Sequence, residues 1–136
     1  MQERVGSCLC GGIRYTITGE PDLVGVCHCR DCQKFTGSAF SFLVVVPEDA
    51  VTFEGKSKTF SIPGDSGKPI ERQFCPECGS SIAERAFTRP GAILINGGTL
   101  DDPTSVKPAI QIYCDRELAW TNLDDSIQRF AEAPPN

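Results

Sequence analysis

The chain has no excess of positive charge, no apolar N-terminal segment and no long hydrophobic run. Its 136 residues contain 13 Lys and Arg against 18 Asp and Glu, a formal net charge of −5. Nucleic-acid binding without sequence preference needs a basic face, so this charge argues against a nucleic-acid partner. The segment MQERVGSC at residues 1–8 lacks the apolar stretch of a secretory signal, and the longest aliphatic run, Phe42–Val46, is too short to cross a bilayer. We therefore expect a cytoplasmic protein that does not bind membranes.

Internal repeats, low-complexity segments and linkers are also absent from the sequence. Hydrophobic residues make up 40% and charged residues 23%, which is the composition of a folded globular chain rather than a disordered one. A chain of this length fits one domain, so we expect a single domain over residues 1–136.

Strand patterns dominate the chain. Ile13, Tyr15 and Ile17 alternate with polar residues, which is typical of a half-buried strand. Residues 38–46 are rich in β-branched and aromatic side chains and predict a central strand. Pro47 is expected to end that strand, because proline cannot donate a hydrogen bond to a neighbouring strand.

The rest of the chain adds mostly strands. Residues 50–55 and 57–62 are expected to pair as a hairpin. Further strands are predicted at residues 70–74, 81–87, 92–98 and 110–113. Short helices are expected only near Arg30 and at residues 124–130, where acidic residues occupy the first turn. The predicted fold class is therefore mainly β with few short helices.

Eight cysteines occur at spacings typical of metal ligands. They form C-x-C at Cys8 and Cys10, C-x-C-x-x-C at Cys27, Cys29 and Cys32, C-x-x-C at Cys75 and Cys78, and a lone Cys114. A reducing cytosol disfavours disulfides, and closely spaced cysteines there indicate metal binding. We therefore interpret the cysteines as metal ligands rather than as a disulfide framework.

The segment CPECG at residues 75–79 predicts a zinc knuckle, a turn that points two sulfurs at one metal. Gly79 permits the positive φ that such a turn often needs. Cys8 and Cys10 are two residues apart on an extended chain, so their side chains face the same way. Together the two pairs predict a closed Cys₄ zinc site that joins distant segments and has a structural role. The alternative is that Cys8 and Cys10 are free, partly buried thiols.

The segment CHCRDC at residues 27–32 offers three sulfurs. Cys27 and Cys29 share a strand face and Cys32 returns from the following turn, which predicts a three-ligand site with an open fourth position, typical of catalytic zinc. His28 lies between two strand ligands, so its side chain is expected to point the other way, as a packed or solvent-facing residue. Cys114 either completes a second Cys₄ site or is an ordinary buried cysteine, and the second reading is favoured.

A zinc ion held by three thiolates has a net negative charge, which weakens its ability to acidify bound water. It can still bind an incoming thiolate and hold that sulfur as a nucleophile. Chemistry on a substrate sulfur is therefore favoured over hydrolysis by zinc hydroxide.

Four motifs follow one another between about Cys8 and Trp120. They are CxCGGIRY, CHCRDCQKFTGSAF, FCPECGS and GGTLDDP. In this order they resemble the glutathione-dependent formaldehyde-activating enzyme family, which includes the centromere protein V-like proteins. The resemblance implies a zinc-binding domain of folded β-sheets, a β-tent of the Mss-four-like type. At Gln111 the chain departs from relatives, which often carry His there.

The resemblance also implies two Zn²⁺ ions per chain and an activity. A structural zinc is implied on Cys8, Cys10, Cys75 and Cys78, and a catalytic zinc with an open position on Cys27, Cys29 and Cys32. The activity implied is that of an S-(hydroxymethyl)glutathione synthase, a carbon–sulfur lyase in the reverse direction, with a glutathione-like thiol as the small-molecule partner.

Glutathione carries two carboxylates, so cations near the three-cysteine segment are candidate substrate contacts. These are Arg30 and Lys34, with Arg72 and Arg85 near the knuckle, and each is more often a solvated surface charge. Thr36, Gly37 and Ser38 are candidate hydrogen-bond donors at the rim of the site, or a plain turn before the strand. The alternative function is a non-enzymatic zinc module that binds a protein partner, with Cys114 as the fourth ligand of the second zinc.

Overall fold

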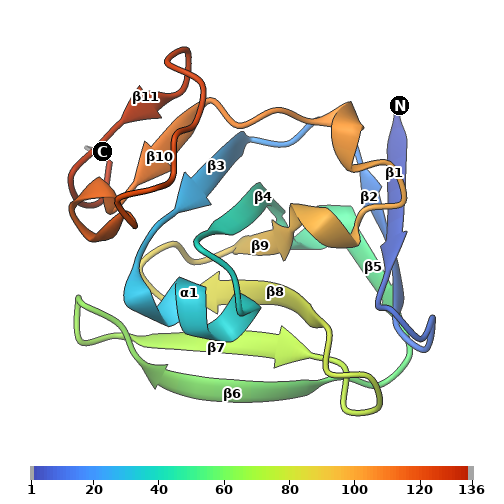
Figure 1. The fold of residues 1–136 in the computed structure, drawn as a ribbon. Coiled ribbons are helices and arrows are strands. Elements are labelled where there is room, and N and C mark those ends of the chain that lie inside the picture. The colour runs from blue at the N-terminus through green and yellow to red at the C-terminus, as the bar shows by residue number, and fades with distance from the viewer. Residues whose placement is uncertain (1, 135–136) are drawn as a thin grey trace.

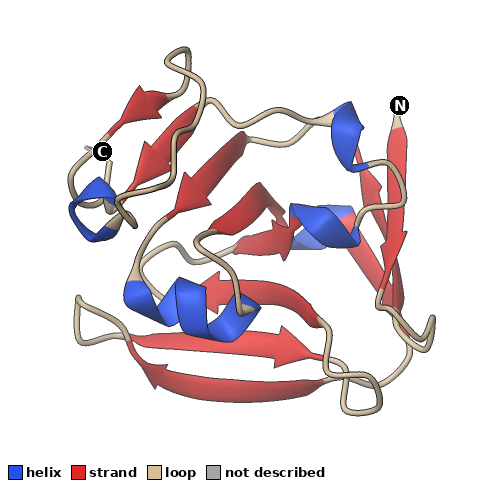
Figure 2. Ribbon diagram, in the orientation of Figure 1, coloured by secondary structure: helices blue, strands red, loops and turns tan. Residues whose placement is uncertain are grey.

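The structure, a computed structural model, describes residues 2–134 and is mainly β, as the sequence predicts (Figures 1 and 2). The strands are β1 (Glu3–Ser7), β2 (Arg14–Thr18), β3 (Leu23–Cys27), β4 (Ser41–Pro47), β5 (Val51–Glu54), β6 (Lys58–Pro63), β7 (Pro69–Phe74), β8 (Ser81–Ala86), β9 (Ala92–Asn96), β10 (Ile110–Ile112) and β11 (Gln128–Arg129). The helices are α1 (Arg30–Thr36) and the short 3₁₀ turns η1 (Glu48–Ala50), η2 (Gly97–Thr99), η3 (Pro103–Ser105) and η4 (Cys114–Arg116). Among the described residues no helix is long and apolar enough to span a membrane.

The strands form two sheets. The smaller sheet is antiparallel with the order β1-β2-β5, and the larger has the order β11-β10-β3-β4-β9-β8-β7-β6. In the larger sheet β10 pairs in parallel with β3 and β11, and the other neighbours are antiparallel. β4 lies inside the larger sheet between β3 and β9, which confirms the central strand predicted within residues 38–46.

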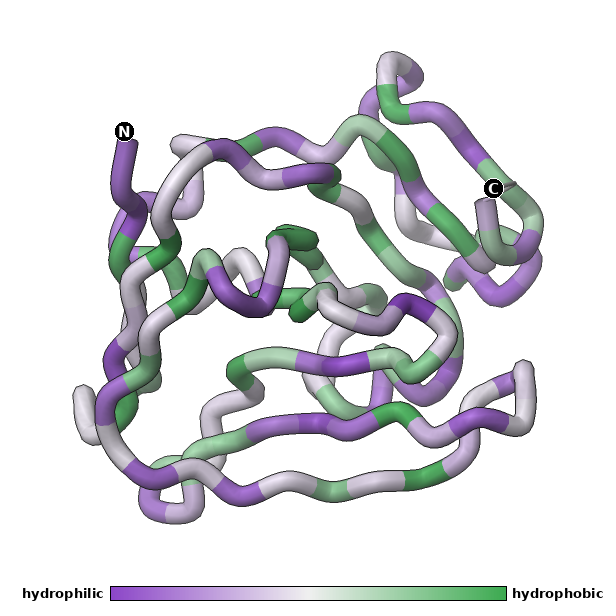
Figure 3. The backbone as a smooth tube through the Cα atoms, turned by 180° about the vertical axis from the view of Figure 1, so that it is seen from behind, coloured by the Kyte–Doolittle hydropathy of each residue, from purple (hydrophilic) through white to green (hydrophobic). Residues whose placement is uncertain are grey.

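The smaller sheet packs against one face of the larger sheet. Tyr15 and Ile17 of β2 join Val44 of β4 in one buried apolar cluster. The alternate residues of each strand, such as Leu43 of β4 and Leu94 of β9, lie on the other face, because side chains alternate along a strand. In Figure 3 the hydrophobic stretches are concentrated on the interior strands. The second face of the larger sheet is left free to carry a site.

Helix α1 connects β3 to β4 and confirms the short helix expected near Arg30. Its N-cap is Cys29, whose Sγ accepts a hydrogen bond from the Cys32 backbone N–H at 3.3 Å. The helix ends at Gly37, which has a φ of 69° and is in the left-handed conformation that glycine adopts without steric cost. The first turn of α1 therefore brings Cys32 back to the end of β3.

Two expectations about local structure are wrong. Residues 51–54 and 58–63 do not pair with each other: β5 pairs with β2 in the smaller sheet, and β6 pairs with β7 in the larger one. Residues 124–130 do not form a helix. The Ser126 N–H donates to Asp124 Oδ1 at 2.9 Å, a local side-chain bond that competes with helix formation, and β11 then pairs with β10.

Candidate metal centres and the cavity beside one of them

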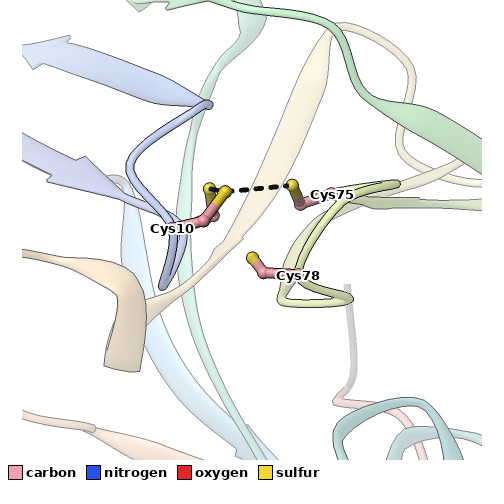
Figure 4. Close-up of side chains that lie close together, drawn as sticks. Cys10, Cys75 and Cys78 are labelled. Carbon is pink, nitrogen blue, oxygen red and sulfur yellow. Dashed lines mark hydrogen bonds between the residues drawn. The ribbon is translucent and has the colours of Figure 1, made fainter.

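Cys8, Cys10, Cys75 and Cys78 form the first sulfur group. All four Sγ atoms lie within 4.8 Å of one another, and they come from the turn after β1 and the turn between β7 and β8 (Figure 4). The sulfurs of Cys8 and Cys10 are 3.6 Å apart, and those of Cys10 and Cys75 are 3.8 Å apart. Four thiolates at ~2.3 Å from a tetrahedral zinc ion are separated by ~3.8 Å, so the group fits this metal.

Neighbouring groups hold these sulfurs in place. The Ile13 N–H donates to Cys8 Sγ at 3.2 Å, and the Ser80 hydroxyl lies 3.2 Å from Cys78 Sγ. Hydrogen bonding from Ser80 lowers the pKa of Cys78 to about 5. Gly79 has a φ of 78°, the positive value expected at the exit of the knuckle. A lowered pKa favours the thiolate, which is the form that binds metal.

Cys27, Cys29 and Cys32 form the second sulfur group, with their Sγ atoms also within 4.8 Å of one another. Cys27 ends β3, Cys29 caps α1 and Cys32 lies in the first turn of the helix. Hydrogen bonds from Cys27 and Cys32 lower the pKa of Cys29, whereas contacts with Cys27 and Cys29 raise the pKa of Cys32. One thiolate therefore forms readily, and a cation bound to the group would displace the protons of the other thiols.

Within residues 2–134, Cys114 and His28 lie outside both sulfur groups. Cys114 Sγ donates to the Gln111 backbone carbonyl at 3.5 Å, which argues against Cys114 as a fourth ligand of a second Cys₄ site. His28 is fully buried against Phe40, with Nε2 3.0 Å from Gln111 Oε1. His28 is thus a packed residue, in line with the expectation from strand alternation, and Gln111 is its partner.

A cavity of about 340 Å³ adjoins the second sulfur group, and none of the first group lines it. We call it the sulfur cavity. Its floor follows one row of cross-strand neighbours on the free face of the larger sheet. The row contains Leu23, Val45, Leu94, Glu84 and Arg72, from β3, β4, β9, β8 and β7 in turn. The row is apolar at the β3 end and charged at the β7 end.

Arg72 and Glu84 form a buried ion pair at the charged end of the row. Arg72 Nε lies 3.7 Å from Glu84 Oε1, and the two side chains are 5% and 6% exposed. Glu84 Oε1 is 4.0 Å from Cys32 Sγ, and burial raises the pKa of Glu84 to about 7 although Arg72 opposes the shift. Nε and Nη1 of Arg72 have no hydrogen-bond partner among the described residues. Arg72 can therefore donate to an oxygen atom brought into the cavity.

The expectation that Arg72 is a solvated charge is wrong, and Glu84 is not identified from the sequence. A usable signal exists for Arg72. Ile70, Arg72 and Phe74 share one face of β7 by the period of two, so an arginine flanked by apolar residues on its own face was a candidate for burial.

The other candidate substrate contacts are placed differently. Arg30 lines the sulfur cavity. Lys34 is exposed on α1. Residues 36–38 are the last residue of that helix, its C-cap and the residue after the cap. None of these four residues lines the cavity. Arg85 forms an ion pair with Glu48 and does not line the cavity either.

Two curated proteins resemble the chain over a segment of 80 residues, and both are provisionally named glutathione-dependent formaldehyde-activating enzymes. The protein from Emericella nidulans is 35% identical, and the segment covers 57% of this chain and 40% of that protein. The protein from Penicillium rubens is 34% identical, with 57% of this chain and 41% of that protein covered. The chain thus spans about two fifths of the length of these relatives.

A solved structure supports the fold. The crystal structure of a Rhodobacter sphaeroides protein superposes with a TM-score of 0.56 at 17% sequence identity, and covers 76% of this chain and 91% of that chain. At this identity the likeness concerns the fold alone. The family model described as glutathione-dependent formaldehyde-activating enzyme matches residues 3–116, most of the chain, and the chain therefore belongs to this family.

Proposed function

We propose that the protein is a zinc-dependent carbon–sulfur lyase that interconverts glutathione plus formaldehyde and S-(hydroxymethyl)glutathione. One observation carries the proposal: the three-sulfur group forms part of a cavity wall, whereas the four-sulfur group lies away from that cavity. Family membership supports glutathione and formaldehyde as the reactants.

The two sulfur groups would hold two zinc ions with different roles. Cys8, Cys10, Cys75 and Cys78 would complete a closed structural site. Cys27, Cys29 and Cys32 would leave one position open toward the sulfur cavity. When bound there, zinc supplies a position at which a substrate thiol ionises and is held as a thiolate.

The chain's own side chains would position the two reactants. Arg30 and Arg89 line the sulfur cavity and can pair with the two carboxylates of glutathione, whereas Arg116, which also lines it, already pairs with Asp65 at 2.9 Å. Arg72, which pairs with Glu84 but has no hydrogen-bond partner for Nη1 in the described part of the chain, can bind the carbonyl oxygen, whose negative charge grows as the carbon–sulfur bond forms. When thiol and aldehyde are held in one cavity, the entropy cost of bringing the two reactants together is met on binding. The activation free energy of the addition is therefore lower than in solution.

The proposal is tested by the exchange of formaldehyde with its glutathione adduct, followed by NMR with zinc-loaded protein. We expect exchange above the uncatalysed rate in the wild type and in Cys114→Ala, because Cys114 lies outside both sulfur groups. Cys32→Ala is expected to reduce exchange to the uncatalysed rate. Calorimetric titration with glutathione should show binding to the wild type and none to Cys32→Ala. An intact protein that binds no glutathione would exclude this thiol as the substrate.

A further inference from the structure

The end of the sulfur cavity near β3 is apolar. Leu23 and Leu94 of the row described above are only half-buried, and Ile110 and Ile112 of β10 line the same end and are also half-buried. When an apolar ligand covers apolar surface inside a concave site, the free energy of the system falls, which favours binding. This end of the cavity is therefore built to receive hydrocarbon.

Formaldehyde and glutathione do not account for these walls. Formaldehyde has no carbon beyond its carbonyl group, so it cannot reach from the sulfurs to Leu23. Glutathione carries two carboxylates and two amides, and burying these groups against aliphatic side chains without hydrogen-bond partners is costly. A second reactant with an apolar portion would fit where these two do not.

The residues of the cavity floor form one line, along which a reactant with a polar end and an apolar end can lie. Arg72 and Glu84 lie at one end beside Cys32, and the next neighbours across the strands are Leu94, Val45 and then Leu23. Adjacent strands are ~4.8 Å apart, so the path from Glu84 to Leu23 spans ~14 Å. The oxygen-binding end and the apolar end are thus separated by the length of a medium hydrocarbon chain.

We propose that the site takes, in addition to formaldehyde, an aldehyde with an apolar chain as a carbonyl substrate, an inference that rests on the proposed thiol-addition function. Its oxygen accepts hydrogen bonds from Arg72, its carbonyl carbon faces the second sulfur group, and its chain lies over Leu94, Val45 and Leu23. The thiol sulfur forms a bond to the carbonyl carbon, the π electron pair of the C=O bond moves to oxygen, and the thiol proton ends on that oxygen. The product is a hemithioacetal.

The test compares propanal, pentanal and octanal, whose carbonyl groups are of similar reactivity, with glutathione as the thiol and formaldehyde as the reference. We expect kcat/KM for adduct exchange to rise with chain length, by up to about fourfold per buried methylene. Formaldehyde exchange combined with a flat or falling series would overturn the inference and leave the proposed function standing. If no aldehyde is exchanged, the proposed function fails instead. The binding of unreactive alcohols then tests whether the apolar end of the cavity binds a hydrocarbon chain.

Calorimetric binding of 1-propanol, 1-pentanol and 1-octanol to zinc-loaded protein reports on the cavity without chemistry. Affinity that rises with chain length supports the inference, and affinity independent of chain length overturns it. Leu94→Gln should remove the chain-length dependence in both experiments. Phe60→Gln is the matched control, because Phe60 pairs with Arg72 in the same sheet but is 57% exposed and does not line the cavity. Equal effects of the two substitutions would count against the position assigned to the hydrocarbon chain of the aldehyde.

Discussion

Tyr15 is a buried phenol with a measurable effect on alkaline stability. It is 2% exposed, and its hydroxyl lies 2.6 Å from Thr99 Oγ1. Burial raises the pKa of Tyr15 from 10.0 to about 12. Between these values the folded protein keeps a proton that the unfolded chain releases. The associated stability is present below pH 10 and is lost as the pH rises to 12, by at most about 1.4 kcal/mol per pH unit.

Tyr15→Phe should therefore change the pH dependence of unfolding. At pH 8 we expect the variant to be less stable than the wild type by about 1 kcal/mol, because the hydrogen bond to Thr99 is lost. Above pH 10 the difference should shrink and then reverse, since phenylalanine has no proton to release. Denaturant unfolding followed by circular dichroism from pH 8 to 11 measures this. Parallel stability curves for the two proteins would show that folding does not raise the pKa of Tyr15.

The three-cysteine site can be predicted from the sequence, whereas the buried ion pair cannot. The spacing of Cys27, Cys29 and Cys32 is local, so strand alternation and one helical turn are enough to predict that their sulfurs meet. The contact of Arg72 with Glu84 depends on the register between β7 and β8. Register is set by the packing of whole strands, and composition alone favours the surface for both residues.

Helix α1 depends on its C-terminal glycine. Gly37 has a φ of 69°, and a Cβ there would meet no atom within 4 Å, so a substitution is strained by backbone conformation alone. Gly37→Ala should lower the free energy of unfolding by about 1 kcal/mol. Gly98→Ala is the matched control, since Gly98 has the same open surroundings without a positive φ. Thermal unfolding of both variants measures the difference, and equal melting temperatures would contradict the strain.

Strands are easier to predict than their partners. The hairpin predicted over residues 50–62 identifies two strands correctly, but the nearest strand in sequence is the wrong partner for each. The ring of Phe53 instead lies 5.8 Å from that of Tyr15, so β5 joins the smaller sheet through packing with a residue far away in the sequence. Such contacts are set by tertiary packing, and short segments of sequence do not predict them.

The two sulfur groups differ in how much of the chain they connect. The second group lies within residues 27–32, so a metal bound there closes only a short loop. In the first group Cys10 and Cys75 are 65 residues apart, and the group joins the smaller sheet to the turn between β7 and β8 (Figure 4). Closing a long loop restricts the unfolded chain more than closing a short one, so the first group should contribute more to folding.

Cys75→Ala and Cys32→Ala should therefore have different consequences. Apparent binding free energies of structural zinc, about 10–16 kcal/mol in small zinc domains, match or exceed the about 5–15 kcal/mol by which a typical domain is stable. We expect Cys75→Ala to unfold the chain, and Cys32→Ala to remain folded while it binds one metal ion fewer than the wild type. Circular dichroism and metal analysis of the purified variants measure both effects. Equal loss of folded structure in the two variants would show that the groups do not divide structural and catalytic roles.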